Sequence, residues 1–275
     1  MLRIMIRKAS VFMLHSYIQE DSALLERMHL MVMLLVSGIF FLGSQVLEAQ
    51  VETDFPAFDG LTVHADEYFL SDTLPYIVLF HQANSSRGEY KEIAPRFVRM
   101  GFNCLAVDLR TGGEKNYVRN LTAMNARAAG LQPGYYDALN DIRGSVRYVE
   151  KKSNKPMILL GSMFSASLCL VEAMNHPNVS AVVALSPGEY FGQRISVTDS
   201  MQFLDKLVYV YSTREENPYV ARIFEKSRGQ FVTMVQPVNI PGHQGSAALL
   251  KENPESHELW LALMIFLNKL FLSTQ

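Results

Sequence analysis

The strongest constraint on the fold is an alternation, from residue 58 onward, of short apolar runs with segments of helical periodicity. Several runs are almost entirely apolar, as expected for strands that are covered on both faces. The runs lie at 61–69, 76–81, 103–108, 156–161, 180–186, 207–212 and 231–236. The helical segments lie at about 88–100, 135–151, 164–176, 218–228 and 257–272. This alternation predicts βαβ units, and therefore an α/β fold with a mostly parallel central sheet and helices on both faces.

One connection in this pattern is unusually long. It covers residues 110–134, whereas an ordinary strand-to-helix loop in such units has about 2–6 residues. Long loops in compact domains often carry function. We therefore expect this segment to border the functional site.

The densest apolar stretch of the chain lies before this pattern, at 31–42, with Arg27 before it and small or polar residues after it. It is shorter than the about 20 apolar residues that a spanning helix needs, and it fits the apolar region of a secretory signal. We expect residues 1–49 to be an N-terminal extension with a signal peptide at about 28–49, and residues 50–275 to form a single exported domain, secreted or periplasmic. An N-terminal membrane anchor is the alternative.

The charge and cysteine content exclude several classes of function. The 25 Lys+Arg and 27 Asp+Glu residues give a formal net charge of −2, and no long basic run is present, so nothing would drive binding to nucleic acid. Cys104 and Cys169 lie in apolar runs without metal-ligand spacing, which favours two buried side chains over a disulfide. We also find no Gly-rich phosphate motif and no ligand cluster, so we expect neither a cofactor nor a metal.

Residues 157–170 run from an apolar strand through small residues directly into a helix. This layout is typical of a nucleophile elbow, a strained turn that needs small residues two positions before and two positions after the nucleophile. Centring the turn on Met163 places Gly161 and Ser165 at those positions. Centring it on Ser162 or Ser165 places a large side chain there, so both alternatives fail. Met163 therefore holds the nucleophile position, although a thioether has no proton to lose.

Further segments accompany the elbow in a characteristic order. They are Leu79-Phe-His-Gln, the strand region 101–110, Ser186-Pro-Gly, Ser212-Thr-Arg-Glu-Glu and Pro241-Gly-His-Gln-Gly-Ser. With these segments and the elbow, the chain resembles the α/β-hydrolase superfamily, especially its dienelactone-hydrolase-like and esterase-like members, over about residues 58–272. The resemblance implies the α/β-hydrolase fold and the chain order nucleophile, acid, histidine.

The resemblance also implies an oxyanion hole made of backbone N–H groups. One donor would be Phe164, which follows the nucleophile position, and the other would be Gln82 or Ala83 in the loop after an early strand. We interpret His81 as a residue that organises this loop rather than as a base. We interpret Asp108, at the end of its strand, as a turn-capping residue.

The acid of the family would follow the strand at 207–212. We choose Glu216, with Glu215 next. Asn217 is a further alternative at this position. Glu189 is another, because some members of the superfamily take the acid from the loop after the preceding strand.

The histidine of the family commonly stands directly before a Gly-Ser or Gly-Thr step. Here the stretch reads Gly242-His243-Gln244-Gly245-Ser246, so strict alignment puts Gln244 at the histidine position and His243 one residue early. A shift of one residue redirects a side chain by several ångströms. We assign His243 as the candidate base and leave open which of the two faces the site.

Two hypotheses for function follow. The first is an exported hydrolase of the serine type that acts on an ester, thioester or amide, impaired by Met163. The second is a non-catalytic protein of the same fold that binds a small ester-like ligand or a protein partner. Whether Met163 is natural or introduced stays open, and so do the substrate and the oligomeric state. We expect no transmembrane span once the signal is removed.

Overall fold

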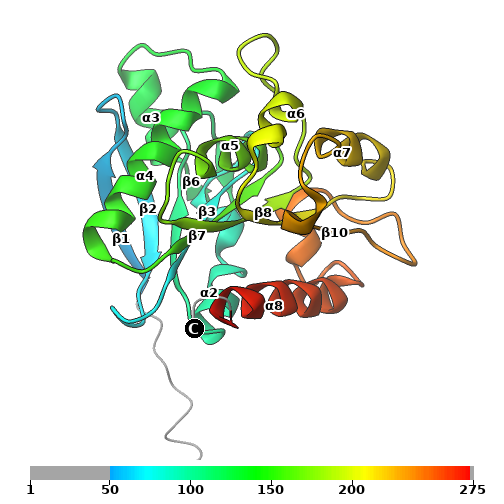
Figure 1. Ribbon diagram of the computed structural model, residues 1–275. Coiled ribbons are helices and arrows are strands. Elements are labelled where there is room, and N and C mark those ends of the chain that lie inside the picture. The colour runs from blue at the N-terminus through cyan, green and yellow to red at the C-terminus, as the bar shows by residue number, and fades with distance from the viewer. Residues whose placement is uncertain (1–49, 273–275) are drawn as a thin grey trace, which may run out of the picture. The chain divides into compact units, whose positions relative to one another are not determined.

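The computed structural model describes residues 50–272, and its centre is an eight-stranded sheet (Figure 1). The strands are β1 Gln50–Pro56, β2 Thr62–Tyr68, β3 Tyr76–Phe80, β4 Asn103–Val107, β7 Met157–Ser162, β8 Val179–Leu185, β9 Leu207–Tyr211 and β10 Val232–Val235. They are arranged in the order β1-β2-β4-β3-β7-β8-β9-β10. Strand β2 is antiparallel to both of its neighbours. The six strands β4, β3, β7, β8, β9 and β10 are parallel to one another, and β1 lies outside this set at the edge beside β2. The expected mostly parallel sheet is confirmed.

Helices cover both faces of this sheet (Figure 1). They are α2 Ala94–Arg99, α3 Leu121–Ala128, α4 Leu139–Lys152, α5 Phe164–Ala173, α6 Val197–Ser200, α7 Asn217–Ile223 and α8 Ser256–Leu272. Neighbouring residues of a strand belong to different core clusters, because successive side chains of a strand point to opposite faces. Val78 packs in the cluster with α4 and α5, and Ile77 packs in the cluster with α2 and α8.

Each strand expected from the sequence forms, with ends within one residue of the expected positions. Strand β1 was not expected. It is an edge strand with several exposed residues, and it ends in Pro56, so it lacks the continuous apolar run of the inner strands. Helix α7 ends at Ile223, earlier than expected, and α5 ends at Ala173.

The long connection at 110–134 contains structure that its sequence did not reveal. A small hairpin of β5 Glu114–Lys115 and β6 Val118–Arg119 is followed by α3. Asn120 is the N-cap of this helix: its side-chain oxygen accepts a hydrogen bond from the Ala123 N–H at 2.7 Å.

Two other features bear on the sequence-based expectations. Cys104 and Cys169 are both buried and lie in the core clusters on opposite faces of the sheet, so no disulfide joins them. Within residues 50–272, no helix combines the length and apolar character needed to cross a membrane. The signal peptide expected at about 28–49 lies outside the described residues.

Candidate functional site

The turn between β7 and α5 has the strained geometry expected of an elbow. Met163 stands at this turn with φ 59° and ψ −119°, a region that non-glycine residues rarely occupy. The strand and the helix approach so closely that a Cβ on Gly161 would collide with the Ala166 backbone. The side chain at the turn is therefore the thioether of Met163.

The two serines beside the turn have structural roles. Ser165 Oγ donates to Phe80 O at 2.7 Å and accepts from the Ser162 N–H at 2.9 Å, which ties β3 to the elbow. Ser162 Oγ accepts from the Ser246 N–H at 3.0 Å. Both side chains are completely buried. Neither hydroxyl is placed to attack a ligand in the cavity above the elbow.

Glu216 and Gln244 are brought together from two different loops. Gln244 Nε2 donates to Glu216 Oε1 at 2.8 Å. The second carboxylate oxygen, Oε2, accepts from Ser186 Oγ at 2.8 Å and from the Thr213 N–H at 3.0 Å. His243 is exposed, one residue before the glutamine. Of the two alternatives at the histidine position, the structure gives Gln244 the hydrogen bond to the carboxylate.

The loop that carries Gln244 is fixed next to the elbow by its glycine. Gly245 has φ 58° and donates its N–H to Ser186 Oγ at 3.0 Å. A Cβ on it would collide with Ser162 Oγ and would also lie 3.4 Å from the Met163 side chain. This loop therefore lies directly against the turn of the elbow.

The other acid candidates lie in different surroundings. Glu189 accepts from the N–H groups of Val197 and Thr198 at 2.9 and 2.7 Å and so holds the start of α6. Glu215 is exposed, and the Asn217 side chain contacts Ser212 Oγ at 3.4 Å. Among the candidates, Glu216 is the one that contacts Gln244.

Phe164 and Gln82 were the two residues assigned to the oxyanion hole. Among them, only Phe164 has a backbone N–H that the described residues leave free to donate to a ligand. Phe164 is the first residue of α5, where helical N–H groups have no partner within the helix. The Gln82 N–H donates instead to Glu89 Oε2 at 3.2 Å. Ala83, the alternative to Gln82, lines the same cavity as Phe164.

The sequence shows no sign of a buried carboxylate, Glu89, that lies close to the elbow. Glu89 Oε1 accepts from Ser246 Oγ at 2.6 Å, and burial raises the pKa of Glu89 above its usual range. Its hydrogen bonds link the loop after β3 to the loop after β10. Nothing in the local sequence marks Glu89, because it lies in a short 3₁₀ helix at 87–90 between two loops.

His81 and Asp108 organise loops, as expected. Burial lowers the pKa of His81 to about 4, so the ring is neutral. Its Nδ1 donates to Gln82 O at 2.7 Å, and its Nε2 accepts from the Leu109 N–H at 2.8 Å. Asp108 accepts from the backbone N–H groups of Arg87 and Leu121 at 2.7 and 2.8 Å.

A cavity of about 270 Å³ lies above the elbow. Its walls are mainly apolar and aromatic: Gln82, Ala83, Tyr135, Met163, Phe164 and Tyr190. The Tyr190 hydroxyl lies 4.0 Å from Met163 Sδ, and burial, together with the charge of Glu216, raises the pKa of Tyr190 to about 12. Tyr135 stacks on the Phe164 ring with 4.7 Å between ring centroids. The cavity can hold an apolar group against residue 163.

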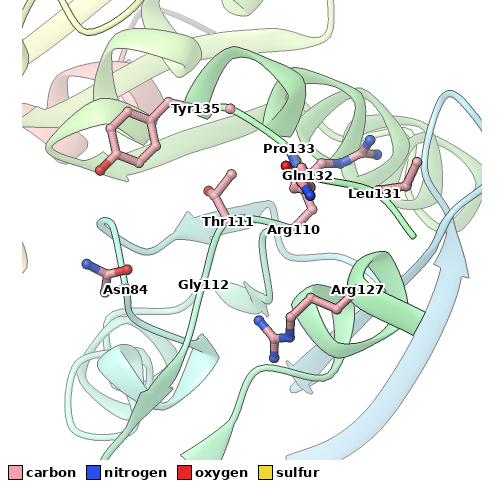
Figure 2. A pocket seen from close by; sticks show the side chains of 10 residues that line it. Asn84, Arg110, Thr111, Gly112, Arg127, Leu131, Gln132, Pro133 and Tyr135 are labelled. Atoms are coloured by element: carbon pink, nitrogen blue, oxygen red, sulfur yellow. The ribbon is translucent and has the colours of Figure 1, made fainter. Parts of the chain in front are cut away.

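A second, more open cavity of about 550 Å³ adjoins the first at Tyr135 (Figure 2). Many of its lining residues come from the long connection at 110–134, whose length predicted that it borders the site. They are Asn84, Arg110, Thr111, Gly112, Arg127, Leu131, Gln132, Pro133, Gly134 and Tyr135. Figure 2 shows Arg127 and Tyr135 at different sides of this cavity, with the Thr111–Gly112 backbone between them.

The arrangement provides places for a ligand but few groups for chemistry. Within residues 50–272, no group of three or more His, Cys, Asp or Glu side chains is arranged to hold a metal ion. The resemblance assigned the nucleophile, histidine and acid positions to Met163, His243 or Gln244, and Glu216, and the structure joins Gln244 to Glu216. Among Met163, Gln244 and Glu216, the carboxylate is the one ionisable group.

The comparisons with known proteins agree with this architecture. No family model matches the sequence, and no curated protein matches it. An esterase from Pyrococcus furiosus matches with a TM-score of 0.57 and 16% identity, over 80% of this chain and 92% of its own. Est1E from Butyrivibrio proteoclasticus matches with a TM-score of 0.58 and 14% identity, over 80% and 98%. A dienelactone hydrolase from Anabaena variabilis matches with a TM-score of 0.55 and 13% identity, over 82% and 98%.

Proposed function

The chain has the α/β-hydrolase fold, and we propose that it binds a small molecule in the pocket of this fold without hydrolysing it. The observation that carries the proposal is the hydrogen bond of 2.8 Å from Gln244 to Glu216. A neutral amide occupies the position in which a catalytic histidine would contact the acid. An amide cannot accept the proton that a nucleophile must lose.

The side chain of residue 163 supports the same proposal. A thioether has no proton to transfer and does not form the acyl intermediate of a serine hydrolase. Two of the three catalytic functions are thus replaced by groups that cannot perform them, while the cavity above the elbow is still lined by aromatic side chains. Loss of chemistry with retention of a pocket favours binding over turnover.

The alternative is a hydrolase of the serine type that acts on an ester, thioester or amide. It would require His243 to replace Gln244 beside Glu216 and would require another nucleophile. Ser162 and Ser165 are both buried and hydrogen-bonded. These contacts favour the non-catalytic function.

The experiment is hydrolysis of p-nitrophenyl acetate and butyrate, together with labelling by a fluorophosphonate. We expect no labelling of the unmodified chain and no saturable turnover. A weak rate above water is compatible with the proposal, because an oxyanion hole and binding alone can give about 10³–10⁴-fold catalysis. Labelling at Ser162 or Ser165, or saturable turnover that His243→Ala abolishes, would establish the hydrolase instead.

We also propose that the protein is exported, on the basis of the apolar segment 31–42 and the basic residue before it. The mature chain then begins near Gln50, the first residue of β1. N-terminal sequencing of the protein from its native compartment tests this. An intact Met1 or Met28 terminus on the native protein would contradict it.

A further inference from the structure

The larger of the two cavities contains a cation that has no side-chain partner among residues 50–272. Arg127 lies in the last turn of α3 and lines the cavity. Within residues 50–272, its guanidinium has neither a salt bridge nor a hydrogen bond. Arg110 lines the same cavity, but Asp59 and Asp141 hold its guanidinium at 2.6 to 2.8 Å. Arg127 is therefore the available positive charge.

A polar group that lines the same cavity also lacks a hydrogen-bond partner in the described part of the chain. Thr111 lines the cavity, and its buried hydroxyl oxygen has no hydrogen-bond partner among the described residues. Buried hydroxyl groups in native structures nearly always have one. A ligand oxygen, met by a rotation of the Thr111 side chain, would supply it. None of the residues that line this cavity is acidic, so nothing on its walls repels an anion.

The two cavities share a boundary. Tyr135 lines both of them, while Ala83 lines the smaller cavity and the next residue, Asn84, lines the larger. A ligand that follows the Tyr135 ring would extend from the polar cavity at Arg127 to the apolar cavity at Met163. The polar end and the apolar end of the site thus differ in chemistry.

From this arrangement, we propose that the ligand is an elongated organic carboxylate. Its carboxylate pairs with Arg127, and its apolar or aromatic part passes Tyr135 into the cavity above Met163. The inference rests on the proposed function, because it identifies the class of ligand for that pocket. A guanidinium recognises a carboxylate through two parallel hydrogen bonds, which gives orientation as well as affinity.

The test is calorimetry with a series of ω-phenylalkanoates, from 3-phenylpropionate to 8-phenyloctanoate, and the corresponding uncharged alcohols. We expect the best acid to bind at least about tenfold more tightly than its alcohol, as one charge-assisted contact allows. Added salt should weaken the acid more than the alcohol, because the cavity is open to solvent.

Variants separate the charge from the apolar contact. Arg127→Gln should remove the preference for the acid and leave the affinity for the alcohol unchanged. Arg222→Gln is the matched control, since Arg222 is also an exposed arginine in the last turn of a helix but lines neither cavity. Tyr135→Ala should weaken acid and alcohol by a similar factor. Circular dichroism melts of all variants establish that they fold.

The outcomes distinguish this inference from the proposed function. Equal binding of acids and alcohols, or a preference that survives in Arg127→Gln, would overturn the carboxylate ligand and leave non-catalytic binding in place. Absence of binding by every member of the series would also overturn it. Labelling of the unmodified chain by a fluorophosphonate would overturn the proposed function, whichever ligand binds at Arg127.

Discussion

Gln244 and Glu216 form a hydrogen bond of 2.8 Å between the loop after β10 and the start of α7. An imidazole at residue 244 would meet the same carboxylate. Serine alone at residue 163 should therefore remain inactive, because no neighbouring group would accept its proton.

This relationship predicts strongly non-additive rescue of activity. Met163→Ser and Gln244→His should each give little hydrolysis of p-nitrophenyl butyrate, and the double variant should exceed either single variant by about 10²-fold or more. The four proteins of the cycle are assayed for turnover and for fluorophosphonate labelling at residue 163. Full activity in Met163→Ser alone would mean that another group, such as His243, reaches the elbow.

The sheet could be predicted from sequence because its inner strands are buried on both faces. Runs such as Leu207–Tyr211 must then be apolar throughout, and the β-branched residues mark them clearly. Strand β1 escaped prediction because an exposed edge imposes no such pattern on Gln50–Pro56. Helix α3 escaped prediction because its Asn120 cap follows a hairpin of only two-residue strands.

The elbow could be predicted because its geometry restricts residue size. The close approach of β7 to α5 requires glycine at residue 161. Because a small residue is needed two positions before the nucleophile, this glycine indicates Met163 as the nucleophile position. The partners of the elbow could not be predicted in the same way. The choice between His243 and Gln244 depends on the direction in which one loop residue points. Arg127 lines its cavity because of the tertiary fold, and no local sequence motif marks it.

Gly161 provides a test of this packing. Gly161→Ala should destabilise the protein by about 2 kcal/mol or more, because the new methyl group meets the rigid backbone of Ala166 rather than a flexible side chain. Gly229→Ala is the control, since a Cβ there meets nothing within 4 Å. The free energies of unfolding are measured in urea. A loss at Gly161 no larger than at Gly229 would contradict the predicted crowding.

The lowered pKa of His81 predicts that the free energy of unfolding depends on pH. Its pKa is lowered to about 4 by burial, below the 6.5 of an unperturbed histidine. Between these values the unfolded chain binds a proton that the native protein does not, so the stability from His81 is full above pH 6.5 and falls as the pH falls toward 4. The expected slope is about 1.4 kcal/mol per pH unit.

The measurement compares urea unfolding of the unmodified chain and His81→Gln from pH 4.5 to 8. The variant should be less stable at pH 8, because it loses buried hydrogen bonds to Gln82 O and the Leu109 N–H. The two curves should converge as the pH is lowered and run parallel above pH 7.5, where histidine is neutral in both states. Parallel curves over the whole range would show that His81 does not titrate in this way.

The backbone at Met163 gives the last prediction. A non-glycine residue with φ 59° and ψ −119° costs about 1–3 kcal/mol, and such strain persists only where the surroundings fix it. Here the Met163 N–H donates to Leu185 O at 2.8 Å, and Ser165 Oγ ties the turn to β3. The strain therefore persists through the packing of the turn, even with a side chain that cannot act as a nucleophile.

Glycine relieves this strain, whereas alanine retains it. Met163→Gly should therefore be more stable than Met163→Ala by about 1 kcal/mol or more. This order is opposite to that in the middle of an ordinary helix, where a protein with glycine is less stable than one with alanine by about 0.5–1 kcal/mol. Ala173→Gly, in the last turn of α5, supplies that ordinary case within the same protein. Urea unfolding of these three variants and of the unmodified chain, which carries Ala173, gives both differences. If Met163→Ala equals or exceeds Met163→Gly in stability, the turn relaxes when the methionine is removed, and a strained elbow independent of its side chain is excluded.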